Sequence, residues 1–226
     1  MKNKLITLSV FFICLVSICQ NSKSGVVKYT FSENYVPQEL KKTRNEIFDK
    51  VVLLSYGLEF TLIFNSEASL FFLDEQIKND FDPLAISFAE NIVSKGKYYF
   101  NKENDTLLRE ADNYPTYTLI GSNSSSTKWK LVNESKLING YTCYKAIRYK
   151  TNKNNNGLFK FKIEAWYTPQ IPVPFGPVEF NNLPGLILEL KDTHYTFHVS
   201  DIKIENDKNR DVKKLTSKDI VYENTE

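Results

Sequence analysis

Few side chains in this chain can do chemistry: the 226 residues include three cysteines and two histidines. His194 and His198 lie four positions apart in a stretch that we expect to be a strand. At about 3.3 Å per residue they would stand roughly 13 Å apart, so a straight strand cannot bring both to one metal ion. Two histidines also exclude a three-histidine metal site. We therefore expect no metal or other cofactor, and each histidine to be at the surface or internally hydrogen-bonded.

The N-terminal residues 1–19 have the pattern of a secretory signal peptide. A basic start and an apolar stretch are followed by the small residues Ser17 and Cys19 before a cleavage site. The apolar stretch is shorter than the roughly 20 residues of a spanning helix, which argues against a membrane anchor. A lipoprotein with an acylated Cys19 is a less favoured alternative, because bulky Ile18 stands where such a signal has a small residue. We expect an exported protein of the periplasm or cell envelope, with residues 20–226 as a single mature domain and no transmembrane span in it.

Cleavage after Cys19 would leave Cys143 as the one thiol of the mature chain. It is then a buried thiol, an intermolecular bridge or a nucleophile, and we expect burial because cysteine is among the residues most often buried. A Cys/His pair would make the protein a hydrolase, and the acidic clusters Asp74-Glu75 and Asp80-Phe81-Asp82 could act as general acids or bases. Paired carboxylates are common at turns, so we expect these clusters to be solvated.

Composition excludes further classes of function. The chain has 29 Lys+Arg and 27 Asp+Glu, and its net charge of +2 comes from Lys2 and Lys4 of the signal, since 29 − 2 = 27 basic residues remain against 27 acidic ones. A neutral mature chain gives no electrostatic reason to bind nucleic acid. With only 8 glycines, no glycine-rich phosphate loop motif is present.

Short alternating or apolar runs separated by Asn, Asp, Ser, Gly and Pro predict a mainly β fold. We expect a curved antiparallel sheet or half-barrel with one or two covering helices. Helices are predicted over Pro37–Leu54 and Pro83–Ser94. We also predict an Asn-rich turn between two strands at Thr151–Gly157 and a short terminal strand near Ile220. The other predicted strands are Val26–Phe31, Leu58–Phe64, Ser69–Leu73, Lys97–Asn101, Thr116–Ile120, Lys128–Val132, Thr142–Lys150, Leu158–Thr168, Leu186–Lys191 and Tyr195–Ile204.

The Asn-rich hairpin indicates which side chains share a face. Alternation places Tyr167 on the apolar side of its second strand and Trp166 on the polar side. A tryptophan on a polar face is either covered by a neighbouring segment or forms a contact surface. A register with Lys145 opposite Glu164 would make an attractive pair and turn Cys143 toward Trp166, although the long loop permits other registers.

The segment Pro172–Gly185 contains four prolines. Because proline fixes φ and lacks an amide donor, Pro172–Pro177 cannot be a central strand and should cross between strands as extended chain. Phe175 and Phe180 line this segment. It is either a plug that seals one end of the sheet, which we favour, or a clamp for a ligand or peptide.

Several short motifs occur in a specific order along the chain: Trp129, Gly140–Ala146, Ala165–Thr168, Ile171-Pro172, Gly176-Pro177 and Leu183–Ile187. This order resembles the GLPGLI family of exported Bacteroidetes proteins. The resemblance covers about the last half of the chain, and Asn182 stands where the name-giving motif begins with Gly, which suggests a left-handed backbone that Asn also visits. The family has no established activity, so the resemblance implies compartment and lineage but no active site.

Two classes of function remain open. The favoured one is a non-enzymatic cell-envelope protein that binds an apolar ligand, a peptide or an envelope protein, with an outer-membrane transport system as one candidate partner. Its contact surface would combine the Trp166 face with Pro172–Gly185, in outline similar to periplasmic lipoprotein carriers. The alternative is a secreted hydrolase that uses Cys143 or carboxylates. The candidate binding or structural residues are Cys143, Trp166, Tyr167, Pro172, Gly176, Pro177, Leu183, Pro184 and Gly185.

Overall fold

A computed structural model describes residues 23–34, 45–74, 80–111, 118–123, 128–154, 157–206, 210–217 and 219–222, and every structural statement below concerns these. The expected signal peptide lies outside the described residues. So do the first part of the helix predicted from Pro37, the acidic residue Glu75, and Asn155 and Asn156 of the Asn-rich turn.

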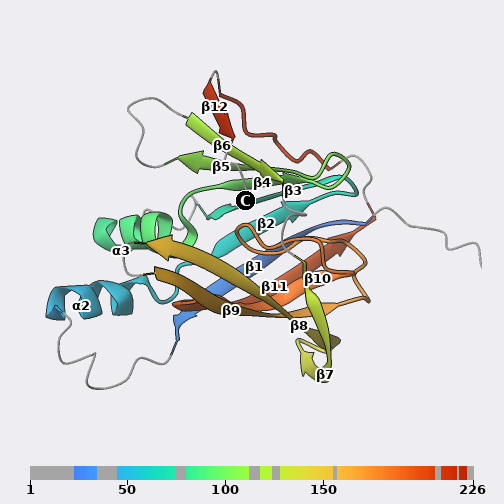
Figure 1. Cartoon of the computed structure of the whole chain (residues 1–226), viewed down its shortest axis with the longest axis horizontal. Coiled ribbons are helices and arrows are strands. Elements are labelled where there is room, and N and C mark those ends of the chain that lie inside the picture. Colours follow the sequence, from blue (N-terminus) through green and yellow to red (C-terminus); the bar gives the residue numbers. More distant parts are fainter. Residues whose placement is uncertain are drawn as a thin grey trace, which may run out of the picture.

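In the described part of the chain, twelve strands form one open sheet in the order β12-β6-β5-β4-β3-β2-β1-β11-β10-β9-β8-β7 (Figure 1). Neighbouring strands are antiparallel except β12, which runs parallel to β6. The mainly β, antiparallel sheet predicted from the alternation of side chains is therefore confirmed. The strands are β1 (Ser24–Glu33), β2 (Phe60–Phe64), β3 (Ala68–Leu73), β4 (Tyr98–Asn101), β5 (Thr106–Ala111), β6 (Thr118–Asn123), β7 (Lys130–Ile138), β8 (Tyr141–Asn154), β9 (Gly157–Thr168), β10 (Leu186–Lys191), β11 (Tyr195–Glu205) and β12 (Asp219–Tyr222).

Two differences from the predicted strands have a common cause. The sequence pattern does not predict β5, because Leu107 and Leu108 are adjacent and break the alternation, yet β6 pairs with all of it and β4 with Thr106–Arg109. The predicted turn between the two strands starts too early, because β8 continues to Asn154 and pairs with β9 down to Gly157. In both cases pairing with neighbouring strands outweighs local propensity.

Two helices lie at one end of the sheet (Figure 1). α2 (Glu46–Ser55) begins at Asn45, whose side chain accepts a hydrogen bond from the amide of Ile47 at 2.9 Å. α3 (Pro83–Phe88) begins at Asp82, which caps the amide of Leu84 at 2.8 Å, and it continues as a π-helical stretch, Ala89–Ser94. The predicted helix from Pro83 to Ser94 is confirmed, and so is the described part of the first one.

The main core occupies one face of the sheet and is rich in aromatic rings, and a smaller apolar cluster around Tyr99 and Leu108 lies on the other face. Phe60 stacks on Phe71 with ring centroids 5.4 Å apart, and the buried hydroxyl of Tyr29 donates to the carbonyl of Ile187 at 2.6 Å. Because that hydroxyl has a partner, a tyrosine can be fully buried in an apolar core.

The proline-rich segment packs against this same face. The ring of Phe175 is fully buried between Phe64 and Phe100, at centroid distances of 5.9 and 6.1 Å. Pro172–Pro177 forms no strand, as predicted. Because the phenylalanine rings point into the core, their burial favours the sealing role of this segment over the clamp.

Two glycines let the proline-rich segment approach other backbone closely. A Cβ at Gly176 would lie 2.5 Å from the carbonyl oxygen of Phe180, and one at Gly185 would overlap the carbonyl of Thr168. Asn182 has a φ of 68°, the left-handed conformation suggested by its place in the motif.

Candidate functional site

Trp166 lies on the face of the sheet opposite the proline-rich segment. In the strand pairing, Trp166 lies opposite Lys145 of β8 and opposite Glu189 of β10, so these three side chains share one face. The predicted register, with Lys145 opposite Glu164, is wrong by two positions. A shift of two keeps every side chain on its face, and the ammonium of Lys145 still reaches the carboxylate of Glu164 at 3.2 Å.

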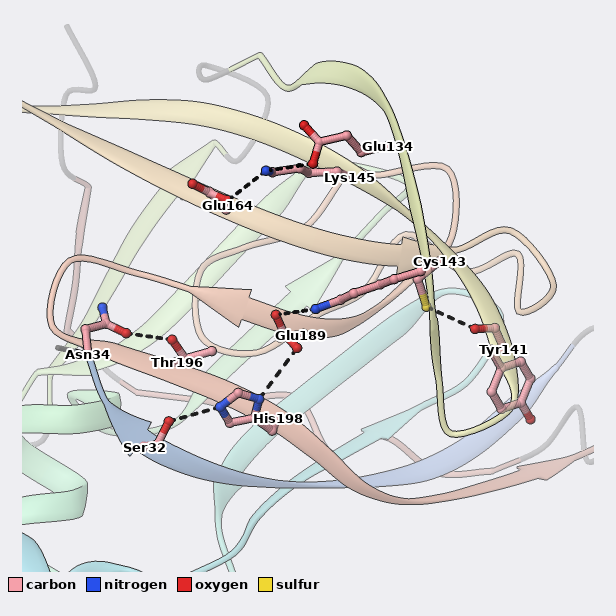
Figure 2. A network of polar contacts seen from close by, with 11 residues as sticks. Ser32, Asn34, Glu134, Tyr141, Cys143, Lys145, Glu164, Glu189, Thr196 and His198 are labelled. Atoms are coloured by element: carbon pink, nitrogen blue, oxygen red, sulfur yellow. Dashed lines mark hydrogen bonds and ion pairs between the residues drawn. The ribbon is translucent and has the colours of Figure 1, made fainter.

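A continuous set of polar contacts crosses this face, and we call it the Trp166 row: Ser32, His198, Glu189, Lys136 and Trp166. The hydroxyl of Ser32 lies 3.0 Å from Nε2 of His198, whose Nδ1 lies 3.6 Å from Oε2 of Glu189 (Figure 2). The other carboxylate oxygen of Glu189 accepts from Lys136 Nζ at 2.8 Å. Lys136 Nζ also lies 4.4 Å from the centroid of the Trp166 ring. The row therefore contains one residue from each of five strands, β1, β11, β10, β7 and β9, and it ends at the indole on β9.

Charge in the row is fixed in place but remains reachable. Burial opposes ionisation of Glu189, yet its contacts with His198 and Lys136 outweigh that effect and hold the pKa of the carboxyl below its usual value. The side chains of Lys136 and His198 keep 36% and 43% of their surface exposed. A ligand can thus meet an oriented ammonium and an imidazole beside an aromatic ring.

A second ammonium approaches the same indole. Lys145 Nζ lies 5.6 Å from the Trp166 ring, and hydrogen bonds to Glu134 and Glu164 raise the pKa of this lysine. Cation–π attraction to two lysines restrains the ring.

The row contains the atom order of a serine hydrolase, with a hydroxyl, an imidazole and a carboxylate in sequence. The distance between His198 and Glu189 is longer than a hydrogen bond, however, and Glu189 lies closer to Lys136. No pattern in the sequence indicates this arrangement, because Ser32 and His198 are 166 positions apart. Only the strand pairing brings Ser32 and Glu189 to His198, and Lys136 to Glu189.

Cys143 is buried, as expected, opposite Lys136 on the neighbouring strand. Burial raises the pKa of its thiol to about 11, Glu189 adds to this, and Lys136 opposes it. Its sulfur lies 3.6 Å from the carbonyl oxygen of Tyr141. A thiol with such a pKa is protonated at neutral pH, so Cys143 is unsuited to act as a nucleophile.

The other candidates have structural contacts. Asp74 binds Lys28 at 3.2 Å and Asp82 caps α3, which agrees with turn and surface roles for both. His194 precedes β11 and its ring contacts Tyr195. Among the described residues, no three acidic, histidine or cysteine side chains gather in a way that could hold a metal ion.

The motif residues are divided between the two faces of the sheet. Tyr167 is buried on the core side, and so are most of the residues of the proline-rich segment, including Leu183. Trp166 lies on the opposite side. The contact surface expected to combine Trp166 with Pro172–Gly185 is therefore not one surface, because adjacent strand positions point to opposite faces.

Aromatic and cationic contacts fasten the proline-rich segment to β8. The indole of Trp129 donates to the carbonyl of Asn181 at 2.8 Å, and the guanidinium of Arg148 lies 4.4 Å from the centroid of Phe180. Burial lowers the pKa of Arg148. Glu179, at the turn of the segment, binds Lys150 at 2.6 Å. Trp129 of the family-like motif thus has an anchoring role.

Comparisons with known proteins assign no activity to this chain. A family model described as "Protein of unknown function (Porph_ging)" matches residues 153–189, a short stretch from the hairpin through the proline-rich segment. It supports an uncharacterised family in this region and does not confirm the GLPGLI name. A comparison with curated proteins found no match.

Two solved structures of PNGF-II resemble the chain. The one in the C2 space group is 18% identical with a TM-score of 0.52, and the alignment covers 90% of this chain and 31% of that one. The one in the P21 space group is 17% identical with a TM-score of 0.50, covering 89% and 31%. At this identity the likeness shows the fold alone, and this chain spans about a third of the length of the PNGF-II chains.

Proposed function

We propose that this protein is an exported cell-envelope protein that binds a partner or ligand without converting it, and that the Trp166 row is its contact surface. The observation that carries the proposal is the placement of two partly exposed side chains, Lys136 and His198, on either side of Glu189, with Lys136 next to the indole of Trp166. Oriented polar groups around an aromatic ring are typical of recognition sites.

Export and the extent of the domain belong to this proposal. Export rests on the signal-like residues 1–19. A single domain over 20–226 is supported by the sheet, in which β1 near the beginning and β12 near the end are strands of one hydrogen-bonded array. In the described part of the chain, no helix has both the length and the apolar character needed to cross a bilayer.

Quantitative affinity purification from envelope extract tests the surface. We expect Trp166→Leu and Lys136→Met to lose partners that wild type retains. Lys28→Met is the matched control, because Lys28 forms ion pairs with Glu59 and Asp74 elsewhere on the sheet at 3.1 and 3.2 Å. Identical partner lists for wild type and Trp166→Leu would contradict the proposal.

A second candidate is a hydrolase with Ser32 as nucleophile, which the 3.0 Å contact with His198 favours. It ranks lower because Glu189 binds Lys136 more closely than it approaches His198. A fluorophosphonate probe should label Ser32 if this activity exists, and labelling should vanish in Ser32→Ala and His198→Ala. Absence of labelling in wild type removes this candidate and leaves the binding proposal intact.

The earlier hydrolase alternative, based on Cys143, has less support. The thiol is buried, with a pKa of about 11. Asp74 forms an ion pair with Lys28, and Asp82 accepts a hydrogen bond from the amide of Leu84 at the start of α3.

A further inference from the structure

The hairpin of β8 and β9 is longer than the strands on either side of it. β7 pairs with β8 only up to Ile147, and β10 pairs with β9 only from Glu164 onward. Beyond these points, Arg148–Asn154 pairs in the described part of the chain only with Gly157–Ile163, as a two-stranded ribbon (Figure 1). One edge of β8 there presents backbone amides and carbonyls that no described strand takes up, and such an edge is a template for another strand.

This edge has neither a bulge nor a proline to block strand addition. The pairing of β8 with β9 is regular from Tyr144 to Asn154, whereas β7, the true edge of the sheet, has a register shift between Val132 and Ser135. No proline occurs in the ribbon. The two described residues before β7, Lys128 and Trp129, are not part of a strand, and the indole of Trp129 donates to the carbonyl of Asn181. Bulges and prolines normally discourage edge pairing, so β8 is the more receptive edge.

An exposed ring of β8 lies beside the open edge, with a cation of β9 over it. Tyr149 is 47% exposed, and the ammonium of Lys160 lies over its ring at 4.4 Å. Leu158, near the end of the ribbon, is 70% exposed. A strand added along β8 would cover Tyr149 and approach Lys160.

The positive charge of the ribbon favours an acidic partner strand. From Arg148 to Ile163 the sequence has five basic residues and no acidic one. Lys150 and Lys162 bind Glu179 and Glu164, while among the described carboxylates none pairs with Lys160. A second copy of this chain, added edge to edge, would set basic residues opposite basic residues, which is destabilising.

We propose that the open edge of β8 beyond Ile147 binds an extended, acidic segment of a partner protein as an added strand. Backbone hydrogen bonds hold the segment, and alternate carboxylates meet the cations of the ribbon. This site is on a strand edge and is independent of the Trp166 row.

Fluorescence anisotropy with labelled synthetic peptides tests the proposal on the full protein. The probes are an eight-residue peptide alternating Thr and Glu, its Thr/Lys counterpart, and the Thr/Glu peptide with its two central threonines replaced by proline. We expect the Thr/Glu peptide to bind at least about tenfold more tightly than the other two. Hydrogen exchange should show slower exchange of amides within Arg148–Asn154 when it is bound.

Two charge reversals locate the site. Lys160→Glu should abolish or invert the preference for the acidic peptide. Lys203→Glu is the matched control: Lys203 is 71% exposed on β11 and its reversal should leave the preference unchanged. Equal binding of all three peptides, unchanged exchange of the β8 amides, or equal losses in both variants would each overturn the proposal. Loss of partners in Trp166→Leu with intact peptide binding separates the two sites.

Discussion

The two faces of the sheet at β9 and β10 are built in different ways. On one face Phe175 is enclosed by other rings, and Gly176 lets backbone approach backbone. On the other face Glu189 forms polar contacts with Lys136 and His198, and these two side chains remain partly exposed. The segment that is most distinctive in sequence is thus the one that the structure buries. The proposed contact surface comes from residues that are ordinary in sequence, because recognition needs reachable polar groups and packing needs rigid, close-fitting ones.

The largest expected effect is on the buried face. Phe175→Ala should lower the free energy of unfolding by about 3–5 kcal/mol, because it leaves a cavity among aromatic rings. Denaturant titration measures it. Leu137→Ala is the control: that leucine is 73% exposed, and its loss should cost no more than about 0.5 kcal/mol. Similar losses for the two variants would mean that the proline-rich segment does not complete the core.

Gly176→Ala should cost about 1–3 kcal/mol, since its Cβ would lie 2.5 Å from the Phe180 carbonyl oxygen and 2.6 Å from Cδ1 of Ile187. The expected observation is a lower thermal midpoint in calorimetry. An unchanged midpoint would show that the segment can relax away from β10.

On the solvent face, Glu189→Gln should cost about 1–2 kcal/mol at pH 7, because a charge-assisted hydrogen bond to Lys136 and the contact with His198 are weakened. Its effect depends on pH. The folded-state pKa of Glu189 is below its unfolded value, so the stabilisation is fully present above about pH 4.3 and is lost as the pH falls through the folded value.

Denaturant titrations of wild type and Glu189→Gln from pH 7 to pH 3 check this prediction. The gap in unfolding free energy should close as the pH falls below about 4.3. A gap that stays unchanged between pH 5 and pH 3 would contradict the ion-paired state of Glu189.

The smallest expected effect is the coupling between Lys136 and Trp166, about 0.5–1 kcal/mol for a partly exposed cation–π contact at 4.4 Å. A double-mutant cycle of Lys136→Met and Trp166→Leu measures it through unfolding free energies. Additive single effects would mean that the lysine is held by Glu189 alone and that the indole is free to engage a ligand.

The sequence predicted most strands and the face on which their side chains lie, but it did not predict how the strands pair. The position of Trp166 on the polar face followed from alternation alone. The register did not, because cross-strand attraction between Lys145 and Glu164 is satisfied both directly opposite and one diagonal away. The hydroxyl–imidazole contact could not be predicted at all, since nothing local relates Ser32 to His198.

Local chemistry therefore determined much of this protein: proline excluded a strand at Pro172–Pro177, Asn182 allowed a left-handed backbone, and alternation set which side chains share a face. Tertiary structure decided the rest. It alone placed β11 between β1 and β10, and so brought Ser32, His198 and Glu189 together. It also left one edge of β8 beyond Ile147 without a partner strand among the described residues. The physical reason is that backbone torsions and side-chain shape act within a few residues, whereas strand order is set by the burial of the whole apolar face.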